Sequence, residues 1–111
     1  MDLVIETTKR GTAVVLTVTG RMDAATAPEF MKVCDGLIDG GDISLIADLG
    51  KLEYISSAGL RSILATAKKL KAMQGEIKFC NLSGMVKDVF NISGFTSMFS
   101  IYPTLDEAAS H

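Results

Sequence analysis

The clearest chemical signal in this sequence lies in one short stretch, from Tyr54 to Leu64. From Leu60 onward the apolar residues recur at helical spacing, so Ser56 and Ser57 stand where a helix begins. A serine hydroxyl there can cap the helix by accepting from the free amides of the first turn, which is a common use. It can also carry a phosphate, because those amides and the positive end of the helix dipole favour an anion. Position alone favours the cap.

The sequence offers no recognisable catalytic constellation around these serines. It has neither a P-loop nor a Gly-x-Ser-x-Gly nucleophile elbow. Its single histidine is His111, the final residue, which argues against a serine–histidine pair. The two cysteines, Cys34 and Cys80, lie far apart without a metal-ligand pattern, so we expect no metal, no cofactor and no disulfide. We expect both cysteines to be small core residues.

Two aspartates, Asp23 and Asp48, follow predicted central strands. In an open α/β sheet the ligand crevice borders the carboxyl ends of the strands, so both carboxylates could lie near Ser57. Each aspartate could equally cap a local turn. A small enzyme using Asp23, Asp48 and Ser57 is the weakest functional hypothesis, because a histidine partner and metal ligands are missing. We therefore expect a protein that is not an enzyme.

Length and composition indicate the class of protein. A chain of 111 residues with 48% apolar residues fits one domain, residues 1–111, with a packed core. A net charge of −2 gives no reason to expect nucleic-acid binding. No apolar run is long enough to cross a bilayer, and the residues from Met1 to Val4 do not begin a signal peptide. We expect a cytoplasmic protein without a membrane partner.

Strand and helix signals alternate along the chain. Alternating or continuous apolar runs predict strands at residues 3–7, 13–19, 43–48, 76–79 and 98–102. Apolar residues at helical spacing predict about four helices, one opened at Thr26 and stopped by Gly40-Gly41, one from about Ser57 to Met73, one over 85–90, and a short one opened at Thr104. Gly20 is expected to end the second strand, and residues 49–55 are expected to form a loop that leads to the serines.

Two of the predicted helices begin with the pattern of a capping box, Thr26-Ala27-Pro28-Glu29 and Thr104-Leu105-Asp106-Glu107. The element order is β-β-α-β-α-β-α-β-α. Strands that alternate with helices need crossover connections, which favours an α/β fold with a mixed, mostly parallel sheet. The opening pair of strands supplies the antiparallel part.

Two motifs in this order resemble a known family. Asp48-Leu49, followed by the run from Leu52 to Leu60, resembles the signature of STAS domains, the anti-sigma factor antagonists. The usual form of that signature is Asp-Leu, a short loop, an aromatic-apolar pair and Asp-Ser-Ser/Ala-Gly-Leu. Gly20-Arg21-Met22-Asp23 resembles the family's second motif, Gly-x-x-Asp. The resemblance covers nearly the whole chain and implies a STAS domain over residues 1–111.

The resemblance implies a bacterial regulator of transcription that works by partner switching. Unphosphorylated members bind an anti-sigma factor, a serine kinase with a histidine-kinase-like ATPase fold, and so release the sigma factor. The kinase ends the complex by phosphorylating the serine, and a PP2C-type phosphatase restores it. By residue match Ser57 is the phosphoacceptor and Asp23 is the loop aspartate of the binding surface. An alternative is a STAS-type scaffold, or a small-ligand or nucleotide-binding signalling domain, without phosphorylation.

The sequence departs from the family's best-known form in one place. Ser56 stands where an aspartate usually precedes the acceptor, so one negative charge is missing and Ser56 is a second, weaker candidate acceptor. Arg61 adds a positive charge that could pair with a phosphate or a partner carboxylate. Gly59 in the first turn would let another surface approach the backbone. The expected partner-binding residues are Asp23, Ser56, Ser57, Gly59 and Arg61.

Overall fold

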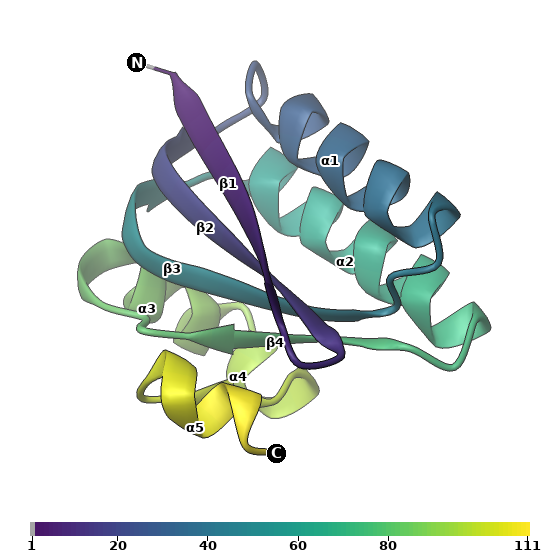
Figure 1. Ribbon diagram of the computed structural model, residues 1–111. Coiled ribbons are helices and arrows are strands. Elements are labelled where there is room, and N and C mark those ends of the chain that lie inside the picture. The colour runs from purple at the N-terminus through teal and green to yellow at the C-terminus, as the bar shows by residue number, and fades with distance from the viewer. Residues whose placement is uncertain (1) are drawn as a thin grey trace.

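A computed structural model describes residues 2–111 of the chain as a mixed α/β domain. The strands are β1 Leu3–Arg10, β2 Ala13–Met22, β3 Ser44–Ile55, β4 Glu76–Cys80 and β5 Ile101–Tyr102. The helices are α1 Ala27–Asp39, α2 Ser57–Ala72, α3 Gly84–Ile92, α4 Phe95–Met98 and α5 Leu105–Ala109. Figure 1 shows α1 and α2 side by side on one face of the sheet and α5 on the other.

The strands form one sheet in the order β1-β2-β3-β4-β5. β1 is antiparallel to β2, and the remaining neighbours are parallel. This confirms the predicted α/β fold with a mixed, mostly parallel sheet. The strands β2 to β5 are parallel because each helical crossover brings the chain back to the end of the sheet at which the previous strand began.

The main core lies between the sheet and the helices α1 to α4. In β2, Val14, Leu16 and Val18 point into this core, while Ala13 and Val15 point to the other face and pack beneath α5. The first half of β2 is therefore buried on both sides, which explains its continuous apolar run. Beyond the cover of α5 the strand alternates buried and half-buried residues.

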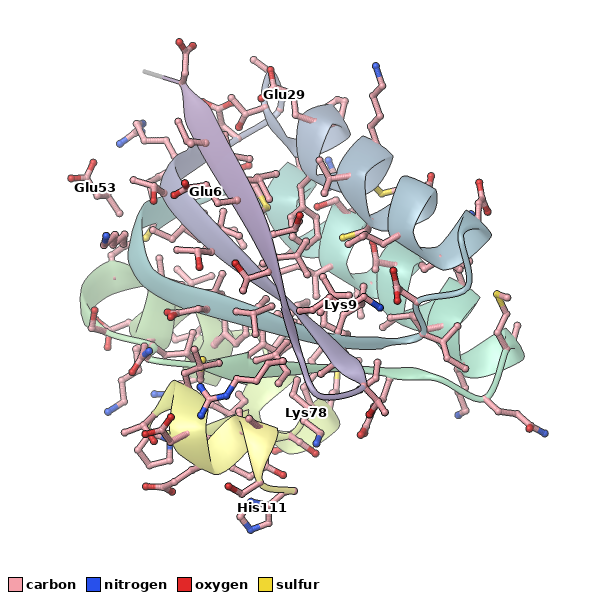
Figure 2. All side chains as sticks on the ribbon, viewed as in Figure 1. Glu6, Lys9, Glu29, Glu53, Lys78 and His111 are labelled. Carbon is pink, nitrogen blue, oxygen red and sulfur yellow. The ribbon has the colours of Figure 1, made fainter. Side chains whose placement is uncertain are left out.

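α5 is fastened to the sheet by a lysine. Lys78 of β4 is 7% exposed, and its ammonium group donates to the backbone oxygens of Ala108 in α5 and of His111 just after it, and also lies 3.6 Å from the carboxylate of Glu76. Figure 2 shows Lys78 and His111 together at this end of the molecule. A buried cation is tolerated here because carbonyls at the negative end of a helix accept its hydrogen bonds.

Two boundaries of the central strands differ from the sequence prediction. Residues 49–55 were expected to be a loop, but they belong to β3, because Lys51 to Ile55 continue to pair with β2 through shifts of register. Gly20 was expected to end β2, but the strand continues to Met22. Gly20 has φ of 111°, which accommodates one of these irregularities inside the strand.

The last predicted strand is mostly wrong. Only Ile101 and Tyr102 form a strand, and the preceding residues include the short helix α4, so residues 2–111 form five helices rather than about four. The aromatic side chains explain the difference. Phe95 and Phe99 pack edge to face at 5.3 Å, and each also contacts a ring of the main core. This packing favours a compact turn over an extended strand.

Among residues 2–111, none of the helices combines the length and the apolar composition that crossing a lipid bilayer requires. The described residues also contain no cluster of histidine, cysteine, aspartate and glutamate suited to a metal ion.

The two cysteines are free and buried, as predicted from the sequence. Burial raises the pKa of both thiols, Cys34 and Cys80, to about 12. The reactive thiolate is therefore scarce near neutral pH. We expect neither cysteine of the folded protein to react with a thiol reagent such as DTNB, and both to react after unfolding in guanidinium. Rapid labelling of the folded protein would contradict this prediction.

Candidate functional site

The sequence left open whether the serines cap the helix or offer a free hydroxyl, and in the structure each serine takes one of these roles. Ser56 is the N-cap of α2, with extended backbone, and its hydroxyl oxygen accepts from the amide of Gly59 at 3.4 Å. Ser57 is the first residue of the helix and is exposed. Within residues 2–111 its side chain makes no hydrogen bond that would hold it. The cap is thus supplied by one serine, and the hydroxyl of the other faces solvent.

The start of α2 is seated on the ends of β2 and β3. The amide of Ser56 donates to the carbonyl of Met22 at 2.9 Å, and its carbonyl accepts from Leu60 at 3.0 Å. Gly59 is buried, and a Cβ there would lie 2.7 Å from Cγ1 of Ile55. The surface that approaches Gly59 is therefore the chain's own core. Gly59 contributes to the site by placing Ser57.

Asp23 organises the loop between β2 and α1. Its Oδ1 accepts from the amides of Ala25 at 3.0 Å and Thr26 at 3.1 Å, which is an Asx-turn. These hydrogen bonds, first the one from the Thr26 amide, lower the pKa of Asp23 from its ordinary value of 3.8. A half-buried carboxylate that is ionised at neutral pH therefore lies in the loop directly after Met22.

The predicted capping box at Thr26 is wrong in its details. α1 begins where expected, but Thr26 has helical backbone angles and makes no side-chain cap. Its hydroxyl instead donates to the carbonyl of Arg21 at 2.7 Å and accepts from the amide of Asp23 at 2.9 Å. The reason is the backbone, because a capping side chain normally reaches its amide from an extended residue. The hydroxyl thus stabilises the Asp23 loop.

Asp48 does not join this group. It lies well inside β3, and at ~3.3 Å per residue it is roughly 20 Å from the strand end that leads to Ser57. Its Oδ1 accepts from the amide of Gly50 at 3.0 Å and from the side chain of Asn81 at 3.1 Å. The expectation that both aspartates approach Ser57 fails because β3 continues past Asp48. Asp48 caps a local irregularity, which is the alternative that the sequence left open.

Arg61 is exposed on α2, four residues after Ser57, so both side chains lie on the same side of the helix. A further pair was not predicted from the sequence. The guanidinium of Arg21 stacks 4.1 Å above the ring of Tyr54, its partner across β2 and β3. In the sequence, the only sign of this pair was an aromatic residue, Tyr54, shortly before the serines. The pairing of β2 with β3 is what places Arg21 above its ring.

A groove with a volume of about 770 Å³ opens between α1 and α2 beside the serines. Its lining residues include Ala27, Met31, Lys32 and Gly36 from α1, and Ala58 and Arg61 from α2. Arg61 therefore belongs both to this groove and to the helix side that carries Ser57.

Fold and site together define a small α/β domain that presents a free serine hydroxyl at a helix start. The sequence matches the STAS domain over residues 4–108. BtrV of Bordetella bronchiseptica, which is named an anti-sigma factor antagonist, is 41% identical over 91 residues, covering 82% of this chain and 78% of BtrV. The chain belongs to the STAS domain family.

Solved structures share the fold. An anti-sigma factor antagonist from Mycobacterium paratuberculosis matches with a TM-score of 0.89 at 24% identity, covering 98% of this chain and 92% of that one. The unphosphorylated form of SpoIIAA matches with a TM-score of 0.80 at 22% identity, covering 95% and 92%. The phosphorylated form of this Bacillus protein matches with a TM-score of 0.73 at 23% identity, covering 97% and 96%.

The packing of α2 against the ends of β2 and β3 predicts the effect of adding a methyl group at Gly59. Gly59→Ala places a Cβ 2.7 Å from Ile55 and 3.1 Å from Met22, and we expect it to lower the free energy of unfolding by about 1–3 kcal/mol. Gly36→Ala is the matched control, because a Cβ there meets no atom within 4 Å and should stabilise α1 by about 0.5–1 kcal/mol. Urea denaturation measures both. Equal effects of the two substitutions on stability would contradict the tight packing of Gly59 against Ile55 and Met22.

The Asx-turn predicts an acidic carboxyl at Asp23. Its pKa in the folded protein should lie below 3.8, as followed by NMR of the carboxyl carbon. Since folding lowers this pKa, the ionised form stabilises the fold. That contribution is present above the pKa of the unfolded chain and is lost as the pH falls through the folded pKa. Asp23→Asn should lack this part of the acid dependence. A measured pKa of Asp23 at or above 3.8 would show that the turn does not stabilise the ionised carboxylate.

Proposed function

We propose that this protein is an anti-sigma factor antagonist, which binds an anti-sigma factor serine kinase while Ser57 is unphosphorylated. The observation that carries the proposal is the exposed Ser57 hydroxyl at the start of α2, with the capping role already taken by Ser56. The name of BtrV supports it, and so does the description of SpoIIAA in both unphosphorylated and phosphorylated forms. In this role the protein is a substrate and binding partner rather than an enzyme.

The proposed partners are those that the family resemblance implies. A cytoplasmic kinase with a histidine-kinase-like ATPase fold would bind the surface around Asp23, Ser56, Ser57 and Arg61, and Gly59 would hold that surface in place. The kinase would transfer the γ-phosphate of ATP to Ser57, and a PP2C-type phosphatase would remove it by hydrolysis. Binding of the kinase by the unphosphorylated protein would free a sigma factor.

A phosphate on Ser57 would end the complex without unfolding the domain. It adds nearly two negative charges at neutral pH, and the helix start offsets part of that by about 0.3–1 kcal/mol. The same charge buried in a contact near the Asp23 carboxylate is unfavourable. A penalty of about 3 kcal/mol would weaken binding more than a hundredfold. One modification can therefore switch the contact while the fold remains.

The geometry favours Ser57 over Ser56 as the acceptor. The Ser56 oxygen accepts a hydrogen bond from Gly59, and the residue is only half-exposed. Phosphorylating it would replace the cap at the point where the helix is seated. The Ser57 hydroxyl can be modified without breaking a hydrogen bond within residues 2–111.

Incubation with the cognate kinase and ATP should add one phosphate to the protein, measured by intact mass spectrometry. Ser57→Ala should abolish it, because the acceptor hydroxyl is gone. Ser56→Ala should still be phosphorylated, although loss of the cap should lower stability by about 0.5–2 kcal/mol. A full phosphate on the Ser57→Ala protein would refute Ser57 as the acceptor.

A further inference from the structure

The groove between α1 and α2 contains a glycine that the fold does not need. Gly36 lies inside α1, where glycine is less favourable than alanine. A Cβ at this position would meet no atom within 4 Å, so no packing contact requires its absence. Its φ also lies outside the left-handed region that favours glycine. The consequence of Gly36 is that the groove stays open, with Ala27, Ala58 and Met31 giving it small and apolar walls.

The charges along the groove are unevenly paired. Asp35 and Asp39 of α1 line the groove and share one cation, Lys69 of α2, at 3.3 and 3.2 Å. Lys32 and Arg61, which also line the groove, are exposed and have no salt-bridge partner within residues 2–111. The groove therefore combines an apolar hollow with two free cations. That combination fits an apolar side chain with a carboxylate beside it.

We propose that this groove receives a segment of the serine kinase that carries an apolar side chain next to an acidic one. The inference rests on the proposed function and extends the contact from the face of Ser57 into the space between the helices. Arg61 joins the two regions, because it lines the groove and lies four residues after Ser57. A buried apolar anchor within a charged rim is the arrangement typical of residues that dominate a protein interface.

This arrangement gives phosphorylation a second effect. A phosphate on Ser57 lies within reach of the guanidinium four residues later on the same side of the helix. It competes for Arg61 with the carboxylate of the docked segment. Release of the kinase then includes loss of contacts in the groove as well as repulsion at Ser57.

The test fills the groove without disturbing the fold. The probe is the purified kinase that phosphorylates Ser57, kept with ADP so that no phosphate is transferred, and the measurement is its Kd by calorimetry. Gly36→Leu should weaken binding at least about tenfold, because a leucine occupies the space of the anchor. Gly36→Ala should weaken it less. The control Lys87→Leu places the same side chain at an exposed site of α3, outside the groove, and should leave Kd unchanged.

The charge of the groove is tested separately. Lys32→Glu should weaken binding about five- to tenfold, with a smaller dependence of Kd on salt, because it removes an attraction to the acidic residue. Lys87→Glu makes the same reversal on α3, outside the groove, and should have little effect. Circular dichroism and thermal unfolding confirm that each variant is folded.

The outcomes separate this inference from the function on which it rests. If Gly36→Leu binds the kinase like the parent while Ser57 is still phosphorylated, the proposed function stands and the groove proposal is overturned. Equal losses in Gly36→Leu and Gly36→Ala also overturn it, because filling the groove would then not be the cause. If the parent neither binds the kinase nor accepts a phosphate, the proposed function fails and the groove proposal fails with it.

Discussion

The contact between the first turn of α2 and the ends of β2 and β3 is the constraint on which the site depends. Gly59 permits it, because any larger residue would collide with Ile55 and Met22. The hydrogen bond from Ser56 to the carbonyl of Met22 fixes the same junction. Once the helix is seated there, its first residue is turned to solvent, and the loop that follows β2 lies beside it. The exposed serine is thus a result of core packing.

The residue that departs from the usual family motif can be explained on the same basis. Serine and aspartate are both strong N-caps, because each offers an oxygen to an amide of the first turn. Ser56 accepts from Gly59 in this way. An aspartate at this position would satisfy the same amide, so the replacement preserves the helix start and changes mainly the charge beside Ser57. The negative charge of the site then comes from Asp23, which its own loop keeps ionised.

The two predicted capping boxes show that a local sequence pattern predicts a helix cap in one place and not in the other. Thr104 caps α5 by accepting from the amide of Glu107 at 3.1 Å, which is the threonine half of the predicted capping box. Thr26 has the same pattern and does not cap, because the Asp23 turn gives it helical backbone angles and engages its hydroxyl. Asp48 lies away from Ser57 for a related reason. Pairing with β2 continues past it, and no local signal in residues 49–55 reports a strand whose partner is distant in the sequence.

What the sequence determined by itself is the part that depends on local periodicity: the alternation of strands and helices, the mixed sheet, and a serine pair at the start of α2. Its motifs also identified the family. Only the tertiary structure decided which serine caps and which is free, that Asp23 and not Asp48 lies by the helix start, and that a groove opens between α1 and α2. These features depend on strand register and helix packing, which join residues far apart in the chain, so periodicity along the sequence cannot report them.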